Sequence, residues 1–445
     1  MKSSDGSVRD ASWQWDGEAD GTAEAPADVL GGGRDEDGSG WRPSRRGLLV
    51  GTGVLAAGGA AWALGRAGGD PMPPGPAEPK PTALSGPTPL WTYRGPQPMT
   101  LGRMVSLPQR PVFLSKAGLQ VLDPATGDPR RLVAFDPPRP RDLPADIELP
   151  LTAVLFGPDQ FFTAASKGHL DAHHLTDPAA DWSLPLPEEP PGQLQLAGLD
   201  DGILYGSVRG WPGPDGSGPA NRIHALRVAD RSLLWSVELP ADRPERPVAP
   251  ATRGGDLRLL PCVRSVGAGT ELVARDAATG REQWTAPGRG DLRWCVADGP
   301  DLLVPDGNGG VLLLGPDGRP GWSHSPARGE SWQAMRPVPA GPKVFVPRGD
   351  GVVSCLDTTT GAVLWSRRLP FLLDSRSRPL FLERTDTLYV PGPASAGVCA
   401  LRAATGRPAW TFRDSGPGRD VWTVSTDGTQ LYAGHDDVLH ALPPD

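Results

Sequence analysis

The stretch "LDTTTGAVLW" (residues 356–365) places an Asp, a Thr-Gly pair and a Trp at fixed spacing. The same unit returns as "RDAATGREQW" (residues 275–284) and as "LRAATGRPAW" (residues 401–410). A Thr-Gly pair favours a tight turn, because glycine readily adopts the left-handed backbone that such turns require. A turn followed at constant distance by a large aromatic side chain, recurring along one chain, predicts a repeat architecture.

Less regular copies extend the repeat at intervals of roughly 40 to 50 residues. They read "LRVADRSLLW" (226–235), "LLGPDGRPGW" (313–322), "HHLTDPAADW" (173–182) and "LDPATGDPRR" (122–131), where Arg131 stands at the Trp position. Seven Trp are each followed by Ser or Thr, and we predict that these serve in structural docking: Trp91, Trp182, Trp235, Trp284, Trp322, Trp365 and Trp410. Neighbours on a strand face opposite sides, so we expect the Trp to be buried and the hydroxyl to face outward.

An alternating hairpin such as "KVFVPRGDGVVSCLD" (residues 343–357) lies ahead of each Trp unit. We count eight hairpins, beginning near residues 112, 160, 203, 257, 302, 343, 387 and 430. Eight hairpins with outer strands predict an all-β fold, an eight-bladed antiparallel β-propeller over residues 91–445. The strand at Trp91 precedes the first hairpin, and the last hairpin lacks a Trp strand. We therefore expect Trp91 to close the ring by joining the last blade.

Composition agrees with many short strands joined by turns. The chain holds 58 Gly and 53 Pro in 445 residues, about a quarter of the total, and these residues lie between short apolar runs. The net charge is −8, and only five of the 44 basic residues are Lys. This is not the basic footprint of a nucleic-acid-binding protein, so we expect no nucleic-acid partner.

The N-terminal part differs from the repeats. Residues 1–46 are rich in Gly, Asp, Glu and Ser without apolar periodicity, which predicts a disordered cytoplasmic tail. Residues 47–65 carry no charge and are long enough for a transmembrane helix. Three Arg precede this segment and one follows it, which places the C-terminal part outside the cell. Residues 66–90 contain eight Pro and form the predicted extended stalk.

Two localisations follow from this leader. In the first localisation, we expect residues 47–65 to remain as a single-pass anchor in the cell membrane, with the propeller outside the cell. In the second, "SRRGLL" (residues 44–49) acts as a twin-arginine signal, to which it is similar, and the chain is secreted.

Four cysteines occur, Cys262, Cys295, Cys355 and Cys399, and none forms a CxxC motif. Zinc-ribbon and thioredoxin-like sites therefore have no support. An even number in an exported domain allows two disulfides, for which we name Cys262–Cys295 and Cys355–Cys399, from neighbouring blades. Buried free thiols are the alternative.

The units resemble the pyrroloquinoline-quinone (PQQ) repeat, whose motif is small-Asp-x-x-Thr-Gly-x-x-x-Trp, over nearly all of residues 91–445. The chain is similar to exported or membrane-anchored PQQ-binding-like propellers of actinobacteria, with the quinoprotein alcohol dehydrogenase-like fold. Dehydrogenases of this kind hold Ca²⁺ and use a catalytic Asp, a Trp under the quinone and, in many cases, adjacent cysteines. This chain has no adjacent cysteines and lacks the long insertions that build that site. The resemblance therefore implies a non-catalytic propeller without cofactor, with a PQQ- and calcium-dependent dehydrogenase as the alternative.

Two groups of residues are candidates for a functional site, one for ligand binding and one for metal binding. The first lies just before the hairpins, at the expected mouth of the ring, and is our candidate for ligand binding: Trp294, Trp332, Trp422, Arg293, Arg376 and Arg419. Trp and Arg dominate binding hot spots, although the Trp could instead fill the wide centre of the ring. The second is "HLDAHHLTD" (residues 169–177), a conceivable metal cluster for which a structural role is favoured, so we expect no metal. His224 and His440 share one repeat position, which indicates a structural role.

The sequence thus predicts a non-catalytic, monomeric, extracytoplasmic scaffold that binds a protein or a cell-envelope ligand. The alternatives are the dehydrogenase and a membrane-anchored sensor whose residues 1–46 report to the cytoplasm.

Overall fold

The computed structural model describes residues 86–444 with internal gaps. The gaps are 108–109, 116–117, 135–153, 158, 165–168, 186–191, 211–220, 249–251, 255–256, 268, 289–291, 293, 328–329, 331, 417 and 419. The predicted tail, the hydrophobic segment 47–65 and nearly all of the stalk lie outside the described residues. The helices found among the described residues are too short to cross a bilayer.

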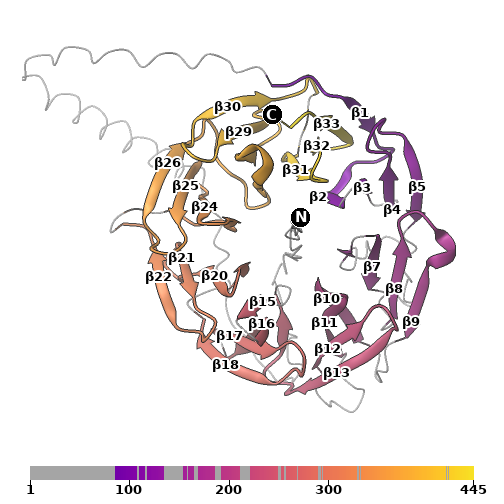
Figure 1. Ribbon diagram of the computed structural model, residues 1–445, viewed down its shortest axis with the longest axis vertical. Helices are drawn as coiled ribbons and strands as arrows, with labels where there is room; N and C mark the ends of the chain where they lie inside the picture. The colour runs from indigo at the N-terminus through magenta and orange to yellow at the C-terminus, as the bar shows by residue number, and fades with distance from the viewer. Residues whose placement is uncertain are drawn as a thin grey trace, which may run out of the picture. The chain divides into compact units, whose positions relative to one another are not determined.

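The described residues form eight antiparallel sheets arranged as the blades of a ring, which confirms the predicted eight-bladed propeller (Figure 1). Blade 1 consists of β2 (Met99–Leu107), β3 (Arg110–Ser115), β4 (Gly118–Leu122) and β5 (Pro129–Ala134). Blade 2 consists of β6 (Val154–Phe156), β7 (Gln160–Ala164), β8 (His169–His174) and β9 (Trp182–Pro185), with the short 3₁₀ helix η1 (Pro178–Ala180) before β9. Blade 3 consists of β10 (Gly192–Asp200), β11 (Ile203–Gly210), β12 (Asn221–Arg227) and β13 (Ser232–Leu239).

Blade 4 has a divided inner strand, because β14 (Glu245–Pro247) and β15 (Thr252–Gly254) both pair with the next strand. It continues with β16 (Leu257–Val266), β17 (Gly269–Asp276) and β18 (Glu282–Pro287). Blade 5 consists of β19 (Val296–Asp298), β20 (Asp301–Pro305), β21 (Val311–Leu314) and β22 (Pro320–His324). Blade 6 consists of β23 (Val338–Ala340), β24 (Lys343–Pro347), β25 (Val352–Asp357) and β26 (Val363–Arg368).

Blade 7 consists of β27 (Leu380–Leu382), β28 (Thr387–Pro391), β29 (Val398–Arg402) and β30 (Pro408–Phe412), with the 3₁₀ helix η2 (Glu383–Thr385) after β27. Blade 8 combines the two ends of the repeat region. Its strands β31 (Thr423–Thr426), β32 (Leu431–His435) and β33 (Val438–Leu442) are completed by β1 (Trp91–Arg94). Trp91 lies opposite Ala441 in the register of β1 with β33, so the predicted closure of the ring is confirmed. Figure 1 shows the first strand lying beside the last.

The hydrophobic core is divided among the interfaces between blades. Among the described residues there are eight buried apolar clusters, and each draws its members from two neighbouring blades. The middle strands of a blade contact neighbours on both faces, so β32 and β33 are buried at every position. The outer strand β26 alternates between exposed and half-buried residues over its last four positions. The middle strands are therefore buried on both faces, beyond the alternation expected for the hairpins, whereas the outer strand keeps an alternating pattern.

Five of the seven Trp named for docking contact the next blade in the same way. Trp365 on β26 packs its ring against Gly406, in the Thr-Gly turn of the next blade, and a Cβ added there would lie 2.5 Å from Trp365 Cε3. The Trp365 Nε1 donates a hydrogen bond of 2.9 Å to the carbonyl oxygen of Ala403 in the same turn. The same pairing joins four more blades to their neighbours, through Trp91 with Gly127, Trp235 with Gly280, Trp284 with Gly318 and Trp322 with Gly361.

Hydrogen bonds of the Asp explain why the turn keeps the same spacing in several repeats of this chain. Asp357 Oδ1 accepts hydrogen bonds from the backbone N–H groups of Thr359 (3.0 Å) and Thr360 (2.8 Å). Asp123 and Asp276 make the same pair of bonds in their own turns. The Asp thus folds the turn, and the Gly at its end presents a bare Cα to the incoming Trp ring.

The Trp–Gly contact predicts a specific cost for adding one methyl group. Gly406 has a φ of +66°, and Gly341 has a φ of +65° with open space where a Cβ would stand. Both Gly406→Ala and Gly341→Ala should lose about 1–2 kcal/mol from left-handed backbone strain. Gly406→Ala should lose about 1–3 kcal/mol more, because the Trp365 ring must move. Urea unfolding midpoints of the two variants give this difference, and equal losses would show that the ring contact contributes nothing.

Candidate functional site

The three Trp proposed at the mouth are buried in the structure. Trp294 and Trp332 are 7% and 8% exposed and pack in the cluster between blades 5 and 6. Trp422 is fully buried between blades 7 and 8. All three therefore fill space between neighbouring blades, whereas the packing alternative placed them in the centre of the ring. Their rings do not form an open aromatic surface.

Polar partners fix the indoles of Trp422 and Trp332 in place. Trp422 Nε1 donates to the carbonyl oxygen of Ala394 at 3.2 Å, and Trp332 Nε1 donates to a Glu330 carboxylate oxygen at 2.9 Å. The Arg348 guanidinium carbon lies 4.2 Å from the centre of the Trp332 ring, which is a cation–π contact. Each Trp of the predicted mouth is thus held by contacts within the chain.

Of the three Arg in the same group, the structure describes Arg376. Arg376 is half exposed and pairs with two carboxylates, Asp374 at 3.0 Å and Asp420 at 2.8 Å. Arg293 and Arg419 lie outside the described residues. A ligand-binding role for this mouth stays a prediction, now with Arg376 as its accessible member.

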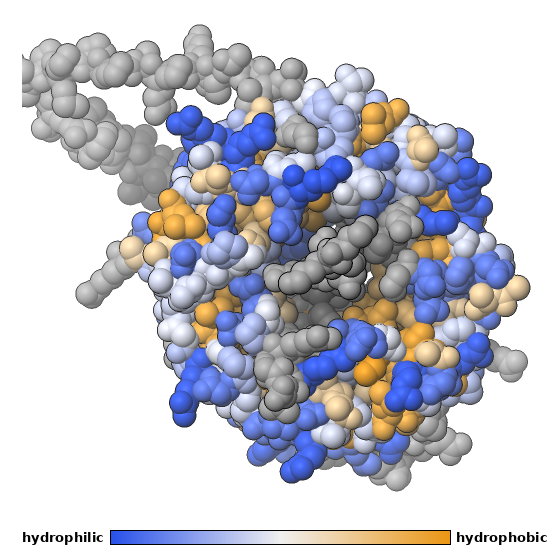
Figure 2. Space-filling model, viewed as in Figure 1, coloured by the Kyte–Doolittle hydropathy of each residue, from blue (hydrophilic) through white to orange (hydrophobic). Residues whose placement is uncertain are grey.

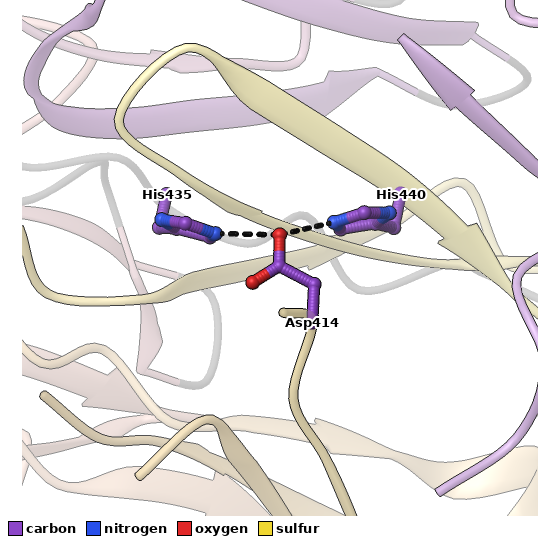
Figure 3. Close-up of side chains that lie close together, drawn as sticks. All are labelled: Asp414, His435 and His440. Atoms are coloured by element: carbon purple, nitrogen blue, oxygen red, sulfur yellow. Dashed lines mark hydrogen bonds and ion pairs between the residues drawn. The ribbon is translucent and has the colours of Figure 1, made fainter. Parts of the chain in front are cut away.

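The structure brings together a second group that the sequence analysis did not predict. His435 ends β32, His440 lies on β33, and Asp414 follows β30 of the preceding blade. His435 pairs with Val438 and His440 with Ala433, so the two imidazoles stand diagonally on one face of a tight hairpin. Figure 3 shows both rings pointing at the same oxygen of Asp414. The distances to Asp414 Oδ2 are 2.9 Å from His435 Nε2 and 3.2 Å from His440 Nε2.

The remaining ring nitrogens also have polar partners. His435 Nδ1 lies 2.8 Å from Asp436 Oδ2, and His440 Nδ1 lies 2.9 Å from Thr92 Oγ1 on β1. Each imidazole is therefore oriented by one group on its far side, while its Nε2 faces the shared carboxylate.

This group is nearly enclosed. The side chains of His435 and His440 are 3% and 6% exposed, and that of Asp414 is 18% exposed. The Trp422 ring lies 4.2 Å from the His435 ring, centre to centre, and packs in parallel beside His440. Low exposure makes each polar contact count more, because few water molecules compete for it.

Burial and hydrogen bonding shift two of these groups. Burial lowers the pKa of His440, although the neighbouring Asp414 acts in the opposite direction. Burial acts to raise the pKa of Asp414, but the hydrogen bonds and charge of His435 outweigh it, and the pKa lies below its ordinary value. Near neutral pH the group thus offers a carboxylate and at least one neutral imidazole, both of which are able to bind a cation.

The sequence carried a partial signal for this group. His435 and His440 enclose the turn Asp436-Asp437 at a spacing that a two-residue hairpin brings to one face. Asp414 is 21 residues away from the nearer His, and only the packing of blade 7 on blade 8 places it there. The prediction of a structural role for His440 therefore missed its contact with Asp414.

The segment at residues 169–177 has local structural partners. The His173 ring stacks on Phe161 at 4.9 Å, and its Nδ1 lies 3.4 Å from Asp181. His174 Nδ1 accepts a hydrogen bond of 3.0 Å from the backbone N–H of Asp177. These contacts are those expected for the structural role that was favoured for the segment.

The disulfide pairing given above is wrong, because all four cysteines are free thiols in the structure. Cys262 lies between blades 3 and 4 and Cys295 between blades 4 and 5, on opposite faces of blade 4. Cys355 and Cys399 share one cluster between blades 6 and 7 as packing residues. The alternative prediction, that the cysteines are buried free thiols, agrees with the structure.

Calcium would be needed for quinone chemistry, and proteins hold it with about six to eight oxygen ligands. Among the described residues, one group of three possible metal-ligating side chains lies close enough together to hold an ion. It consists of Asp414, His435 and His440. Two of its three ligand atoms are imidazole nitrogens, which do not fit calcium. We therefore derive no quinone-dependent step.

Comparisons with known proteins agree with this repeat architecture. A PQQ-repeat family model, described as outer membrane protein assembly factor BamB, matches residues 307–442. This chain is a propeller with PQQ-like repeats. The matched part of the PQQ-like propeller contains Asp414, His435 and His440.

A curated relative matches over a limited length. The outer membrane protein assembly factor BamB of Burkholderia pseudomallei (strain K96243) is 31% identical over 152 residues, which is 32% of this chain. The match spans 38% of the length of that relative.

Two solved structures share the fold of the PQQ-like propeller. The computationally designed Ika8 protein aligns with a TM-score of 0.55 and 13% identity, over 80% of this chain and 99% of its own. The quinohemoprotein alcohol dehydrogenase ADHIIG of Pseudomonas putida HK5 aligns with a TM-score of 0.51 and 10% identity, over 80% of this chain and 76% of its own. At these identities the likeness concerns the fold alone, and the expected fold is confirmed.

The buried thiols of the PQQ-like propeller should be unreactive. Burial raises the pKa of Cys295 to about 12 and the pKa values of Cys355 and Cys399 to about 11, and it also raises the pKa of Cys262. Since the thiolate is the reactive form, a thiol reagent should label the native chain very slowly and label four cysteines after denaturation without reductant. Fewer than four labels in the denatured chain would indicate disulfides, and rapid native labelling would contradict the burial.

Proposed function

We propose that this PQQ-like propeller is a non-catalytic, extracytoplasmic scaffold that binds a protein partner. The partial relative carries the name of an assembly factor, which supports a binding role. The observation that carries the proposal is an exposed apolar edge on blade 6. Export is proposed from the sequence of residues 44–65 alone, by the membrane anchor or the twin-arginine route.

The edge of blade 6 is the outermost strand β26, which has a partner on one side only. Its first residues, Val363 and Leu364, are 49% and 52% exposed, and Leu372 in the segment after it is 68% exposed. Two adjacent apolar residues on a free strand edge favour addition of a partner strand, which pairs with the backbone and covers the side chains. Elsewhere on outer strands the exposed large apolar residues of the described chain occur singly, as Leu132 on β5 and Leu233 on β13.

The face of the molecule drawn in Figure 2 fits selective binding at such edges. Figure 2 shows a face that is mostly hydrophilic, with separate apolar patches among charged and polar residues. Isolated apolar residues need no explanation, whereas an apolar group at a free strand edge marks a contact site. A protein partner with an extended, apolar segment matches this edge, and a cell-envelope ligand is the other class that we keep from the sequence analysis.

The runner-up is a quinone-dependent dehydrogenase, supported by the fold of the quinohemoprotein alcohol dehydrogenase and not by any fitting calcium site among the described residues. A membrane-anchored sensor remains a third proposal. It rests on residues 1–46, and their deletion should then change a cellular response.

We expect the β26 edge to be the contact site in cells. Blade 4 offers a matched control, because Glu282 and Gln283 precede Trp284 as Val363 and Leu364 precede Trp365. A photo-cross-linking residue at position 364 of the full-length protein should give a discrete adduct, and one at position 283 should not. With the probe at position 372, the double change Val363→Glu and Leu364→Gln should reduce the adduct about tenfold or more, since two apolar contacts are lost.

This double change lies on the surface and should alter the free energy of unfolding by about 0.5 kcal/mol or less. Equal adducts from positions 364 and 283, or an adduct unaffected by the double change, would show that the β26 edge is not the binding surface.

We also expect no saturable binding of pyrroloquinoline quinone by the full-length protein in the presence of Ca²⁺, and no turnover of alcohols or sugars. Isothermal titration, together with absorbance of bound quinone, measures the first, and dye reduction measures the second. Calcium-dependent binding near a Kd of 1 µM, which corresponds to about −8 kcal/mol, would establish the dehydrogenase instead.

A further inference from the structure

We propose that Asp414, His435 and His440 bind one zinc ion, and that this ion holds the ring closed at blade 8. The inference stands on the geometry of this group and is independent of the partner proposed for the β26 edge.

The positions of the three ligand atoms suit a single small cation. One Nε2 from each imidazole and one carboxylate oxygen all lie within 4.8 Å of one another. The two distances to Asp414 Oδ2, 2.9 Å and 3.2 Å, are close to the separation of neighbouring ligands around zinc. That separation is about 3.3–3.4 Å in a tetrahedral site with metal–ligand bonds of about 2.0–2.1 Å. Small movements of the side chains would therefore admit the ion.

The groups behind the imidazoles support this reading. A histidine that binds metal through one nitrogen usually donates the other N–H to a carboxylate or another oxygen, which fixes the ring. Asp436 stands 2.8 Å from His435 Nδ1, and the Thr92 hydroxyl stands 2.9 Å from His440 Nδ1. Both rings are therefore oriented with Nε2 toward the shared position.

The choice of zinc follows from the donor types. Two imidazoles and one carboxylate favour transition metals over calcium or magnesium, and zinc commonly takes four ligands in a tetrahedral arrangement. Three come from the chain, and a water molecule supplies the fourth on the side of Asp414, which is the most exposed of the three. The Trp422 ring covers the imidazoles from another side.

The place of the group in the fold gives the ion its role. Asp414 belongs to the segment that leaves blade 7, both imidazoles belong to the C-terminal hairpin, and Thr92 belongs to the N-terminal strand of blade 8. One ion would thus join blade 7 to the hairpin directly and reach β1 through Thr92. This is the point where the two ends of the repeat region meet. Because the ion binds the closed ring and not the open chain, its binding energy stabilises closure.

Without metal the same contacts would form a hydrogen-bonded network, in which the His435 ring bridges Asp414 and Asp436. The two states differ in a measurable way. Purified without a His tag and without chelator, the full-length protein should contain about one zinc per chain by elemental analysis. After removal of zinc, Co²⁺ should bind with one equivalent and give the intense visible bands of a four-coordinate site.

Zinc should also raise the melting temperature of the metal-free protein. At a hundredfold excess over Kd the shift should be about 3–5 °C for a domain of this size. His435→Gln and Asp414→Ala should abolish this shift and the cobalt bands. Asp436→Asn should keep the site but weaken zinc binding about tenfold, because it alters the group that orients His435.

His224→Gln is the matched control, since His224 occupies on blade 3 the repeat position of His440 and is also buried. This variant should retain one zinc and the full shift in melting temperature. Absence of zinc from the purified protein together with no cobalt or zinc binding by the folded wild type would overturn the proposal. So would binding that survives in both His435→Gln and Asp414→Ala, because the ion would then lie elsewhere.

Discussion

The fold depends on a contact between an aromatic ring and a glycine with no side chain. Five of the docking Trp pack on the turn Gly of the next blade, while the Nε1 of each donates a hydrogen bond to a carbonyl oxygen of that turn. The contact needs a positive φ and an absent Cβ at the same residue, which only glycine supplies without strain. This contact recurs at five of the interfaces between neighbouring blades, and Figure 1 shows how the blades follow one another around the propeller.

In two irregular repeats, an Arg replaces either the docking Trp or the turn Gly, and a different contact joins the blades. Arg131 stands where the Trp is expected, and its guanidinium pairs with Asp181 in the turn of blade 2 at 2.7 Å. At the next interface the turn Gly is replaced by Arg231, which has a φ of 59°. Its guanidinium carbon lies 5.2 Å from the centre of the Trp182 ring. A salt bridge and a cation–π contact thus replace aromatic packing on glycine, and both still join an outer strand to the following turn.

Local signals explain what could be predicted from the sequence. The eight hairpins, the outer strands and the closing role of Trp91 follow from alternation, turn residues and spacing within about 20 residues. Exposure is not a local property, which is why Trp294, Trp332 and Trp422 could not be assigned to packing or to binding in advance. The pairing of cysteines failed for the same reason, since Cys262 and Cys295 lie close in the repeat count but on opposite faces of one blade.

Buried polar groups far apart in sequence were the least predictable feature. Glu245 is fully buried and accepts a hydrogen bond of 2.5 Å from Arg275 Nε, although 30 residues separate the two. Arg275 also donates to the carbonyl oxygen of Gly280, so the pair supports a docking turn. Asp414 and the two imidazoles are a second case, assembled across blades 7 and 8. Glu245 reaches Arg275 only when the strands of blade 4 pair, and Asp414 reaches the two histidines only when blade 7 packs on blade 8.

Ring closure explains why such a group would stand on blade 8. Seven blades are each built from one continuous segment, whereas blade 8 must hold an N-terminal strand that no turn connects to it. Apart from strand pairing, β1 is held by Trp91 on the turn of blade 1, by Thr92 against His440 and by the ion pair of Arg94 with Asp437 at 2.8 Å. The ion pair is exposed and contributes little. The contact through Thr92 is more enclosed and leads directly to the Asp414 group, so the strength of closure depends on what occupies that group. A scaffold that offers the free edge of blade 6 to a partner must keep its blades in fixed positions while a strand is added. In the function that we propose, the enclosed polar group at the closure would keep the ring rigid, and the apolar edge at β26 would bind the partner.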